Sequence, residues 1–369
     1  MTAVAHGVGQ PLDRIPRVAL VAEPTPLQEA SRLSAELGVR VLFKRDDLTG
    51  AGLGGNKLRG LEYLVADARR EGCDCLVTGA GPQSNWTLLA ALACLRYGLE
   101  AHVVCYGTGA ADEGNMRLHR WLGTDVRFTG SGERASVDAG IAAVGDELRA
   151  AGRRPYLVPR GGATPLGSLG YVRASAELAT QLAELGESPT RLWLATGSCG
   201  TQAGLVAGAA LAGTELTGAE PGARLSGAGY RVTGVSVSRP VAECRERVAT
   251  LAAQAGALAS ARAGALADSG SAAPADGGGA LAGGGGGVRM PPVEVLAGWI
   301  GAGYGVASEA GEAAARLVAR LEGVFLDPVF GAKAMAALIN ACRSREVTGT
   351  QLFLVSGGAP TLFTSKAEL

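Results

Sequence analysis

A glycine-rich turn delivers a lysine that could do covalent chemistry. The turn GLGGNK at 52–57 precedes a segment whose apolar residues have helical spacing, which places Lys57 in the first turn of that helix. The positive end of a helix dipole disfavours the charged form of a lysine, so the pKa falls and the free amine can form a Schiff base. A solvated surface lysine is the alternative interpretation of this segment taken alone.

A second loop has the composition of a phosphate-binding turn. The segment TGSCGT at 196–201 follows an apolar strand and opens a helix. Its glycines would let a ligand approach the backbone N–H groups, and Ser198 and Thr201 add hydroxyls. The loop lacks the lysine of a P-loop and the spacing of a dinucleotide fingerprint, which favours a phosphate monoester. An ordinary tight turn is the alternative.

Two further loops follow predicted strands. In GAGPQSNW at 79–86, Ser84 and Asn85 could contact polar atoms of a cofactor or substrate, although either could simply be a helix N-cap. The segment VSGGAP at 355–360 follows the last predicted strand. Loops at the carboxyl ends of strands share one crevice in a parallel α/β sheet, so we expect all four loops to meet there.

The elements that must position these loops alternate along the chain. Short apolar runs and helical patterns predict βαβ units and a mainly parallel sheet. We expect strands at 75–78, 102–106, 125–128, 191–196, 231–238 and 351–355, and helices at 57–69, 85–97 and 201–211.

One segment breaks this alternation. Residues 252–288 are rich in alanine and glycine and show no period that could bury a face. This predicts a flexible insertion in an overlong surface loop, with a domain linker as the alternative.

Composition excludes several classes of function. The 369 residues include 34 Lys+Arg and 34 Asp+Glu, so there is no basic field for nucleic acid or an anionic membrane. No apolar stretch reaches the roughly 18 residues of a membrane span, and the start resembles no signal peptide, which predicts a soluble, cytoplasmic protein. The seven cysteines are scattered, which predicts reduced thiols and no metal site, and three histidines offer little for a catalytic triad.

Five segments together resemble one family, in order, over nearly the whole chain outside the alanine- and glycine-rich segment. This is the D-cysteine desulfhydrase and 1-aminocyclopropane-1-carboxylate deaminase family, within the tryptophan-synthase-β-like pyridoxal-phosphate enzymes of fold type II. The segments are FKRDDLTGAGLGGNKLRGLEYL at 43–64, GPQSNW at 81–86, ATGSCGTQAGL at 195–205, LDPVFGAKAMAAL at 326–338 and SGGAPTLF at 356–363.

The resemblance implies an architecture, a cofactor and an assembly. The fold would be a two-domain α/β structure with parallel-rich sheets flanked by helices. A small domain of about 53–165 would be inserted into a large domain formed by 1–52 and 166–369. Pyridoxal 5'-phosphate would lie between the domains, the substrate would be a small amino acid, and the chain would form a homodimer.

The resemblance also implies roles for individual residues. Lys57 would hold the cofactor as a Schiff base and abstract the α-proton. Asn85 would donate to the phenolic oxygen of the cofactor, and Ser84 would stand near the substrate carboxylate. Ser356 would face the pyridine nitrogen in place of the usual threonine, and Tyr304 would lie beside the cofactor. The phosphate would be held by Gly197, Ser198, Cys199, Gly200 and Thr201, with Cys199 where the family usually has glycine.

The substrate pocket departs from the family pattern. Besides Gln83 and Ser84 it would contain Trp86, where the family shows histidine or glutamine, and Phe330-Gly331, where the family shows Tyr-Glu or Tyr-Thr. Val355 replaces a histidine. Each change removes a polar group, which predicts a less polar pocket and a larger or less polar substrate than D-cysteine.

Three hypotheses about the function follow from these observations. The first is β-elimination from a small amino acid, with D-cysteine as the default substrate and opening of a cyclopropane amino acid, or a specialised β/γ-replacement reaction, as alternatives. The second is a non-catalytic protein that binds pyridoxal phosphate as a scaffold. The third is a nucleotide-binding kinase or dehydrogenase, which the missing P-loop lysine and dinucleotide spacing disfavour.

Overall fold

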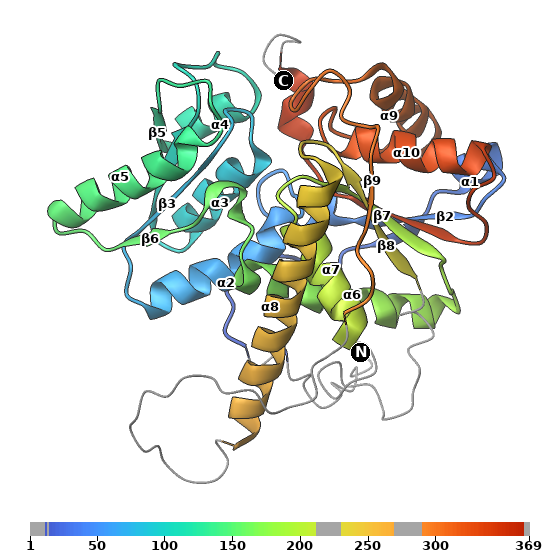
Figure 1. Ribbon diagram of the computed structural model, residues 1–369, viewed down its shortest axis with the longest axis horizontal. Helices are drawn as coiled ribbons and strands as arrows, with labels where there is room; N and C mark the ends of the chain where they lie inside the picture. Colours follow the sequence, from blue (N-terminus) through green and yellow to red (C-terminus); the bar gives the residue numbers. More distant parts are fainter. Residues whose placement is uncertain (1–11, 13–14, 212–229, 269–289, 365–369) are drawn as a thin grey trace, which may run out of the picture.

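The computed structural model describes residues 12, 15–211, 230–268 and 290–364, and this part of the chain contains two sheets (Figure 1). The larger sheet has the strand order β1-β2-β10-β7-β8-β9. Strand β1 is antiparallel to β2, and every other neighbouring pair is parallel. The strands are β1 Leu27–Glu29, β2 Val41–Arg45, β7 Arg191–Thr196, β8 Arg231–Ser236, β9 Glu294–Leu296 and β10 Gln351–Val355.

The smaller sheet is wholly parallel and has the order β5-β4-β3-β6. Its strands are β3 Cys75–Ala80, β4 Glu100–Cys105, β5 Asp125–Phe128 and β6 Pro155–Leu157. Figure 1 shows this sheet on the left, beside the helices α3 Asn85–Arg96, α4 Gly114–Leu122 and α5 Ser136–Ala150.

Alternation along the strands gives the larger sheet two apolar faces. Leu42, Leu352 and Leu192 lie in register and share one buried cluster with the helices α6 Pro165–Leu185, α7 Gly200–Leu211 and α8 Val241–Asp268. The next residues, Phe43, Phe353 and Trp193, lie in the cluster with α1 Ser31–Leu37, α9 Glu309–Glu322 and α10 Gly331–Arg343. Helices therefore cover both faces.

The smaller sheet is buried in the same way. Leu76 packs with the helix α2 Lys57–Arg70 and with α3, whereas Cys75 and Val77 pack with α5. Because α2 contacts α6 as well as α3, it connects the two sheets. The predicted domain boundaries at 53 and 165 are compatible with these sheets but stay a prediction.

The α/β fold with parallel-rich sheets is confirmed, and each strand and helix predicted above exists within a few residues of its expected bounds. The prediction omitted the three-residue strands β1, β6 and β9, which carry too short a pattern to detect. It also omitted β2 and the helices α1, α4, α5, α6, α8, α9 and α10.

The prediction of a flexible insertion from residue 252 is wrong for 252–268. These residues continue α8, and Ala252, Ala255 and Ala259 are fully buried against the core at helical spacing. Alanine is the best helix former, and its small side chain lets α8 pack closely, so an apolar stripe made of alanines was mistaken for low complexity. Residues 269–288 lie outside the described part.

This packing predicts a stability difference within α8. Ala255→Glu should lower the free energy of unfolding by about 3 kcal/mol or more, because a carboxylate would be buried without a partner. The matched control is Ala257→Glu, at an exposed position two residues away, which should change stability by less than about 0.5 kcal/mol. Chemical denaturation measures both, and equal stability of the two variants would contradict the burial of this helix face.

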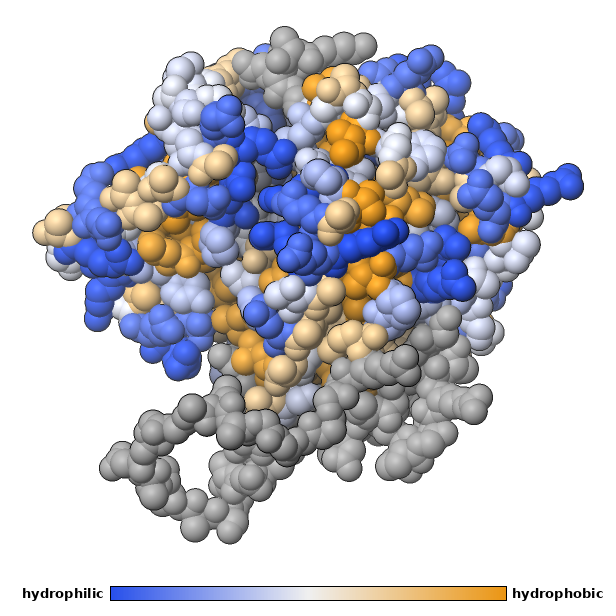
Figure 2. Space-filling model, in the orientation of Figure 1, coloured by the Kyte–Doolittle hydropathy of each residue, from blue (hydrophilic) through white to orange (hydrophobic). Residues whose placement is uncertain are grey.

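Three features of the structure relate to function: membrane-spanning helices, clusters of metal ligands and the distribution of hydrophobic residues on the surface. Among the described residues, no helix is both long and apolar enough to cross a membrane, and no cluster of three or more potential metal ligands occurs. On the face that Figure 2 shows, hydrophobic residues form separate patches between hydrophilic ones.

Candidate active site

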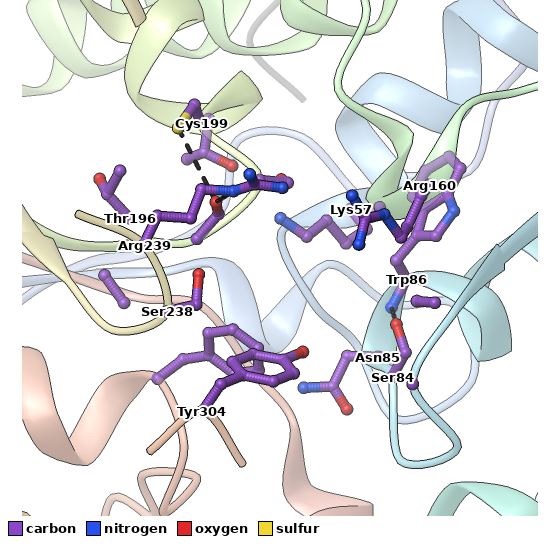
Figure 3. Close-up of a pocket in the computed structure, with 18 of the residues that line it drawn as sticks. Lys57, Ser84, Asn85, Trp86, Arg160, Thr196, Cys199, Ser238, Arg239 and Tyr304 are labelled. Carbon is purple, nitrogen blue, oxygen red and sulfur yellow. Dashed lines mark hydrogen bonds between the residues drawn. The ribbon is translucent and has the colours of Figure 1, made fainter. Parts of the chain in front are cut away.

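A cleft of about 920 Å³, counted with its open mouth, is lined by loops from both sheets (Figure 3). Segments that follow β3, β4, β5 and β6 contribute one group of lining residues: Gly81, Ser84, Asn85, Trp86, Tyr106, Arg134 and Arg160. Segments that follow β7, β8 and β10 contribute another: Thr196 to Cys199, Thr201, Ser238, Arg239 and Ser356. The carboxyl ends of the strands therefore meet at one site, as predicted from the four loops.

One lysine is available for chemistry in the described part of the chain. The sequence has lysines at 44, 57, 333 and 366, the last outside the described residues. Lys44 is bonded to Thr25, Glu177 and Gln181, and Lys333 donates to the carbonyls of Ile300 and Gly303. Lys57 lines the cleft, and its amine has no hydrogen-bond or ion-pair partner among the described residues.

The environment of Lys57 shifts its equilibrium toward the neutral amine. Burial in the cleft wall lowers the pKa of Lys57 from 10.5 to about 8. About one amine in ten is then unprotonated at pH 7, far more than for an ordinary lysine, and this is the nucleophilic form. Figure 3 shows the side chain reaching from the start of α2 toward the side of the cleft that carries Arg239 and Cys199.

Close backbone packing requires glycine in the turn before Lys57. Gly54 has φ +71°, and a Cβ there would lie 1.9 Å from the carbonyl oxygen of Asp47. Asn56, two residues later in the turn, donates its backbone N–H to the Ser356 carbonyl at 3.0 Å. The turn is thus joined to the loop after β10, which fixes where α2 begins.

The loop 197–201 presents unpaired donors at the start of α7. The backbone N–H groups of residues 198–201 have no acceptor in the described part of the chain, as expected at a helix N-terminus. Thr201 accepts from the Asn56 amide at 3.0 Å. Cys199 has φ +77°, a conformation that favours glycine. The buried hydroxyl of Ser238, also on the cleft wall, lacks a partner among the described residues.

The loop after β3 orients three side chains. Ser84 caps α3 by accepting from the Trp86 backbone N–H at 3.2 Å, so the N-cap alternative is correct, yet Ser84 also lines the cleft. The Asn85 carbonyl oxygen accepts from Asn115 at 2.9 Å, which leaves its NH₂ group to donate. The Trp86 indole donates to Thr78 at 2.9 Å and forms part of the cleft wall.

Aromatic side chains form another wall. Tyr304 packs edge-on against Phe330 with ring centroids 6.1 Å apart, and the Arg134 guanidinium lies 4.4 Å from the Tyr304 ring centroid. Burial raises the pKa of Tyr304 to about 12. Tyr304 is therefore neutral at physiological pH and can donate its hydroxyl proton in a hydrogen bond.

Comparisons with known proteins agree with this arrangement. A family model described as pyridoxal-phosphate dependent enzyme matches residues 18–357. The chain belongs to this family. It is 37% identical over 361 residues to D-cysteine desulfhydrase of Salmonella choleraesuis (strain SC-B67), covering 95% of this chain and 97% of the relative.

Two further likenesses cover nearly the full length. A putative 1-aminocyclopropane-1-carboxylate deaminase of Pyrococcus abyssi (strain GE5 / Orsay) is 33% identical over 352 residues, or 95% of this chain and 94% of the relative. A crystal structure of an ACC deaminase homologue superimposes with a TM-score of 0.79 at 32% identity, covering 96% and 95% of the two chains. The predicted family, fold type and cofactor are confirmed: this pyridoxal-phosphate enzyme is a lyase or deaminase.

The cleft of this pyridoxal-phosphate enzyme fits its cofactor. A free amine with a lowered pKa, on Lys57, suits a Schiff base with an aldehyde. The unpaired N–H groups of 198–201 and the unpartnered Ser238 hydroxyl suit a phosphate. The free NH₂ group of Asn85 suits a phenolate oxygen.

Some predicted pocket residues do not line the cleft. Gln83 instead bonds the backbone of Glu113 and Asn115, and Gly331 donates its N–H to Asp327 at 2.8 Å. Val355 is buried within the core of the larger sheet. Gly200 lines a small adjoining cavity rather than the main cleft.

Other cleft residues were missed by sequence reasoning. They include Tyr106, Arg134, Arg160, Ser238 and Arg239, each of which follows the carboxyl end of a strand. Their position after a parallel strand was the available signal. None stands in a recognisable motif, so nothing separated them from ordinary loop residues.

The phosphate loop predicts the effect of Gly200→Val. A Cβ at Gly200 would lie 3.3 Å from the Ala163 side chain, so valine would disturb the loop that presents the N–H groups. We expect the cofactor Kd to rise about tenfold or more, with the apo-protein still folded. Gly109→Val is the control, since a Cβ there meets nothing within 4 Å. Equal cofactor affinity of Gly200→Val and the parent would remove this loop from the site.

Proposed function

We propose that the enzyme removes the α-proton of a small amino acid and eliminates a group from its β-carbon, with D-cysteine as the default substrate. The carrying observation is the free Lys57 amine, held in one cleft with Ser84, Asn85 and residues 197–199 and 201 of the phosphate loop. The likeness to D-cysteine desulfhydrase supports this reaction.

Each side chain has a role in that reaction. Bound pyridoxal phosphate supplies the electron sink that stabilises negative charge at the α-carbon. The neutral Lys57 amine accepts the α-proton, and Ser84 at the start of α3 binds the substrate carboxylate. Ser356 would face the pyridine nitrogen with a neutral hydroxyl, which suits elimination because the leaving group takes the electrons early.

Opening of 1-aminocyclopropane-1-carboxylate is the second candidate, since two of the similar proteins bear deaminase names. Phe330 and Gly331 stand where the resemblance calls for Tyr-Glu, and neither can move a proton. We therefore expect negligible ring opening.

We also propose that the enzyme works as a homodimer in the cytoplasm.

The test is product formation by the holoenzyme. D- and L-cysteine, D- and L-β-chloroalanine and 1-aminocyclopropane-1-carboxylate are offered separately, and release of keto acid and ammonia is followed. We expect pyruvate from at least one β-substituted alanine and no 2-oxobutyrate from the cyclopropane. Absence of pyruvate from every β-substituted alanine, or ring opening that exceeds them all, would reject the proposal.

A further inference from the structure

The cleft carries positive charge beyond the lysine amine that the proposed elimination requires. Besides Lys57, its lining includes Arg134, Arg160 and Arg239, and no aspartate or glutamate from the described residues. Resting on the proposed β-elimination, but in place of D-cysteine as its default substrate, we propose that the preferred substrate bears a second acidic group, an oxyanion attached at its β-carbon, and that Arg134 binds this group.

Arg134 is the cation without a counter-charge. Arg160 pairs with Asp138 at 3.3 Å, and Arg239 pairs with Glu243. Arg134 has no ion-pair partner among the described residues, and its one hydrogen bond is to the Ser238 carbonyl at 3.4 Å. A cation that lines a cleft and has no carboxylate within ion-pair distance among the described residues is suited to bind an anion that enters from solution.

The geometry of Arg134 leaves its donors available. The guanidinium lies 4.4 Å from the centroid of the Tyr304 ring, a cation–π contact that holds the group without using its N–H donors. Of the five N–H groups of an arginine, four stay free here. A planar fork held in this way matches the two oxygens of a carboxylate, phosphate or sulfonate.

Arg239 has a different position. Its Nε donates to the Gly197 carbonyl at 3.1 Å, so it lies against the loop that suits the cofactor phosphate. We assign Arg239 to the phosphate end of the cofactor and Arg134 to the substrate. This division also replaces the sequence-based expectation of an apolar pocket, since Gly331 and Val355, on which it partly rested, do not line the cleft.

The assignment gives a balanced reaction for a phosphate leaving group. Lys57 takes the proton from the α-carbon, the β-carbon–oxygen bond breaks, and its electron pair leaves on phosphate. Charge on that oxygen increases as the bond breaks, so Arg134 binds it more strongly in the transition state than in the substrate. The resulting enamine hydrolyses with water to pyruvate and ammonium.

The experiment compares O-phosphoserine with O-acetylserine, both as D and L forms, on the holoenzyme. Pyruvate release gives kcat/KM, and inhibition of β-chloroalanine turnover reports binding of slow substrates. We expect the preferred enantiomer of O-phosphoserine to react or inhibit at least about tenfold better than O-acetylserine. Arg134→Met should remove that preference, Arg134→Lys should retain part of it, and cofactor Kd should change less than about threefold.

Arg149→Met, at an exposed position on α5, is the control and should leave the preference unchanged. The inference is wrong if the parent treats O-acetylserine as well as O-phosphoserine, or if Arg134→Met weakens both equally. It is also wrong if Arg134→Met raises the cofactor Kd and leaves the substrate preference intact. Failure of β-chloroalanine and every other β-substituted alanine to give pyruvate would instead reject the proposed function.

Discussion

Lys57→Ala should lower turnover by at least about 10⁴-fold and abolish the visible absorption band of lysine-bound cofactor. A general base alone contributes about 10²–10⁴-fold, and the Schiff base is lost as well. The fold should survive, because the Lys57 amine makes no hydrogen bond or ion pair among the described residues. Turnover assays and absorption spectra of the holoenzyme measure both effects.

Lys333→Met tests whether Lys333, in place of Lys57, forms the Schiff base with the cofactor. Its amine donates to Ile300 at 2.7 Å and Gly303 at 3.2 Å, so this variant should lose stability but keep the absorption band. A band that persists in Lys57→Ala and vanishes in Lys333→Met would transfer the Schiff base to Lys333.

The second large effect is on stability. Arg59, two residues after Lys57, is 1% exposed and binds the fully buried Asp46 through two hydrogen bonds of 2.8 Å. It also donates to Glu177 at 3.0 Å. Arg59→Met would remove a buried cation from two carboxylates and leave only Lys44, which pairs with Glu177, to balance their charge within the network. We expect a loss of about 3–5 kcal/mol in the free energy of unfolding.

The pH dependence gives a second readout of this network. Burial alone would raise the pKa of Asp46, but the Arg59 charge and hydrogen bonds outweigh it and hold the pKa below 3.8. The contribution of Asp46 is therefore complete above pH 3.8 and is lost as pH falls through the lowered pKa. The parent should lose this contribution in acid, and Arg59→Met should lose much less.

Arg70→Met is the control on the same helix. Its guanidinium is exposed and pairs with Asp67 on the surface, so stability should stay essentially unchanged. Denaturation of the three proteins checks the prediction. Equal midpoints for Arg59→Met and the parent would show that the buried network does not hold α2 in place.

Sequence reasoning found the parts of the site that are local in the chain. The turn at 52–57 and the loop at 196–201 carry their chemistry within six residues each, and both lie at the cleft. Arg134 could not be found in this way, because its role depends on Tyr304, which is 170 positions away in the sequence and meets it only in the fold.

In the fold, too, the features that depend on neighbouring residues were predicted, and the features that depend on tertiary packing were missed. Strands such as β3 and β7 were predicted because their apolar residues are contiguous. The buried face of α8 beyond residue 251 was missed since the fully buried residues there are alanines, whose burial depends on how closely α8 approaches the core. Which loop residues face the cleft likewise depends on packing, as Gln83 and Trp86 show.

The most direct test of Lys57 as the residue that binds the cofactor is chemical trapping of the Schiff base. Holoenzyme is treated with borohydride, which reduces the carbon–nitrogen double bond to a stable amine, and digested peptides are analysed by mass spectrometry. We predict one pyridoxyl-phosphate adduct, on Lys57. An adduct on Lys44, Lys333 or Lys366 in its place, or none in protein that has bound the cofactor, would contradict the account.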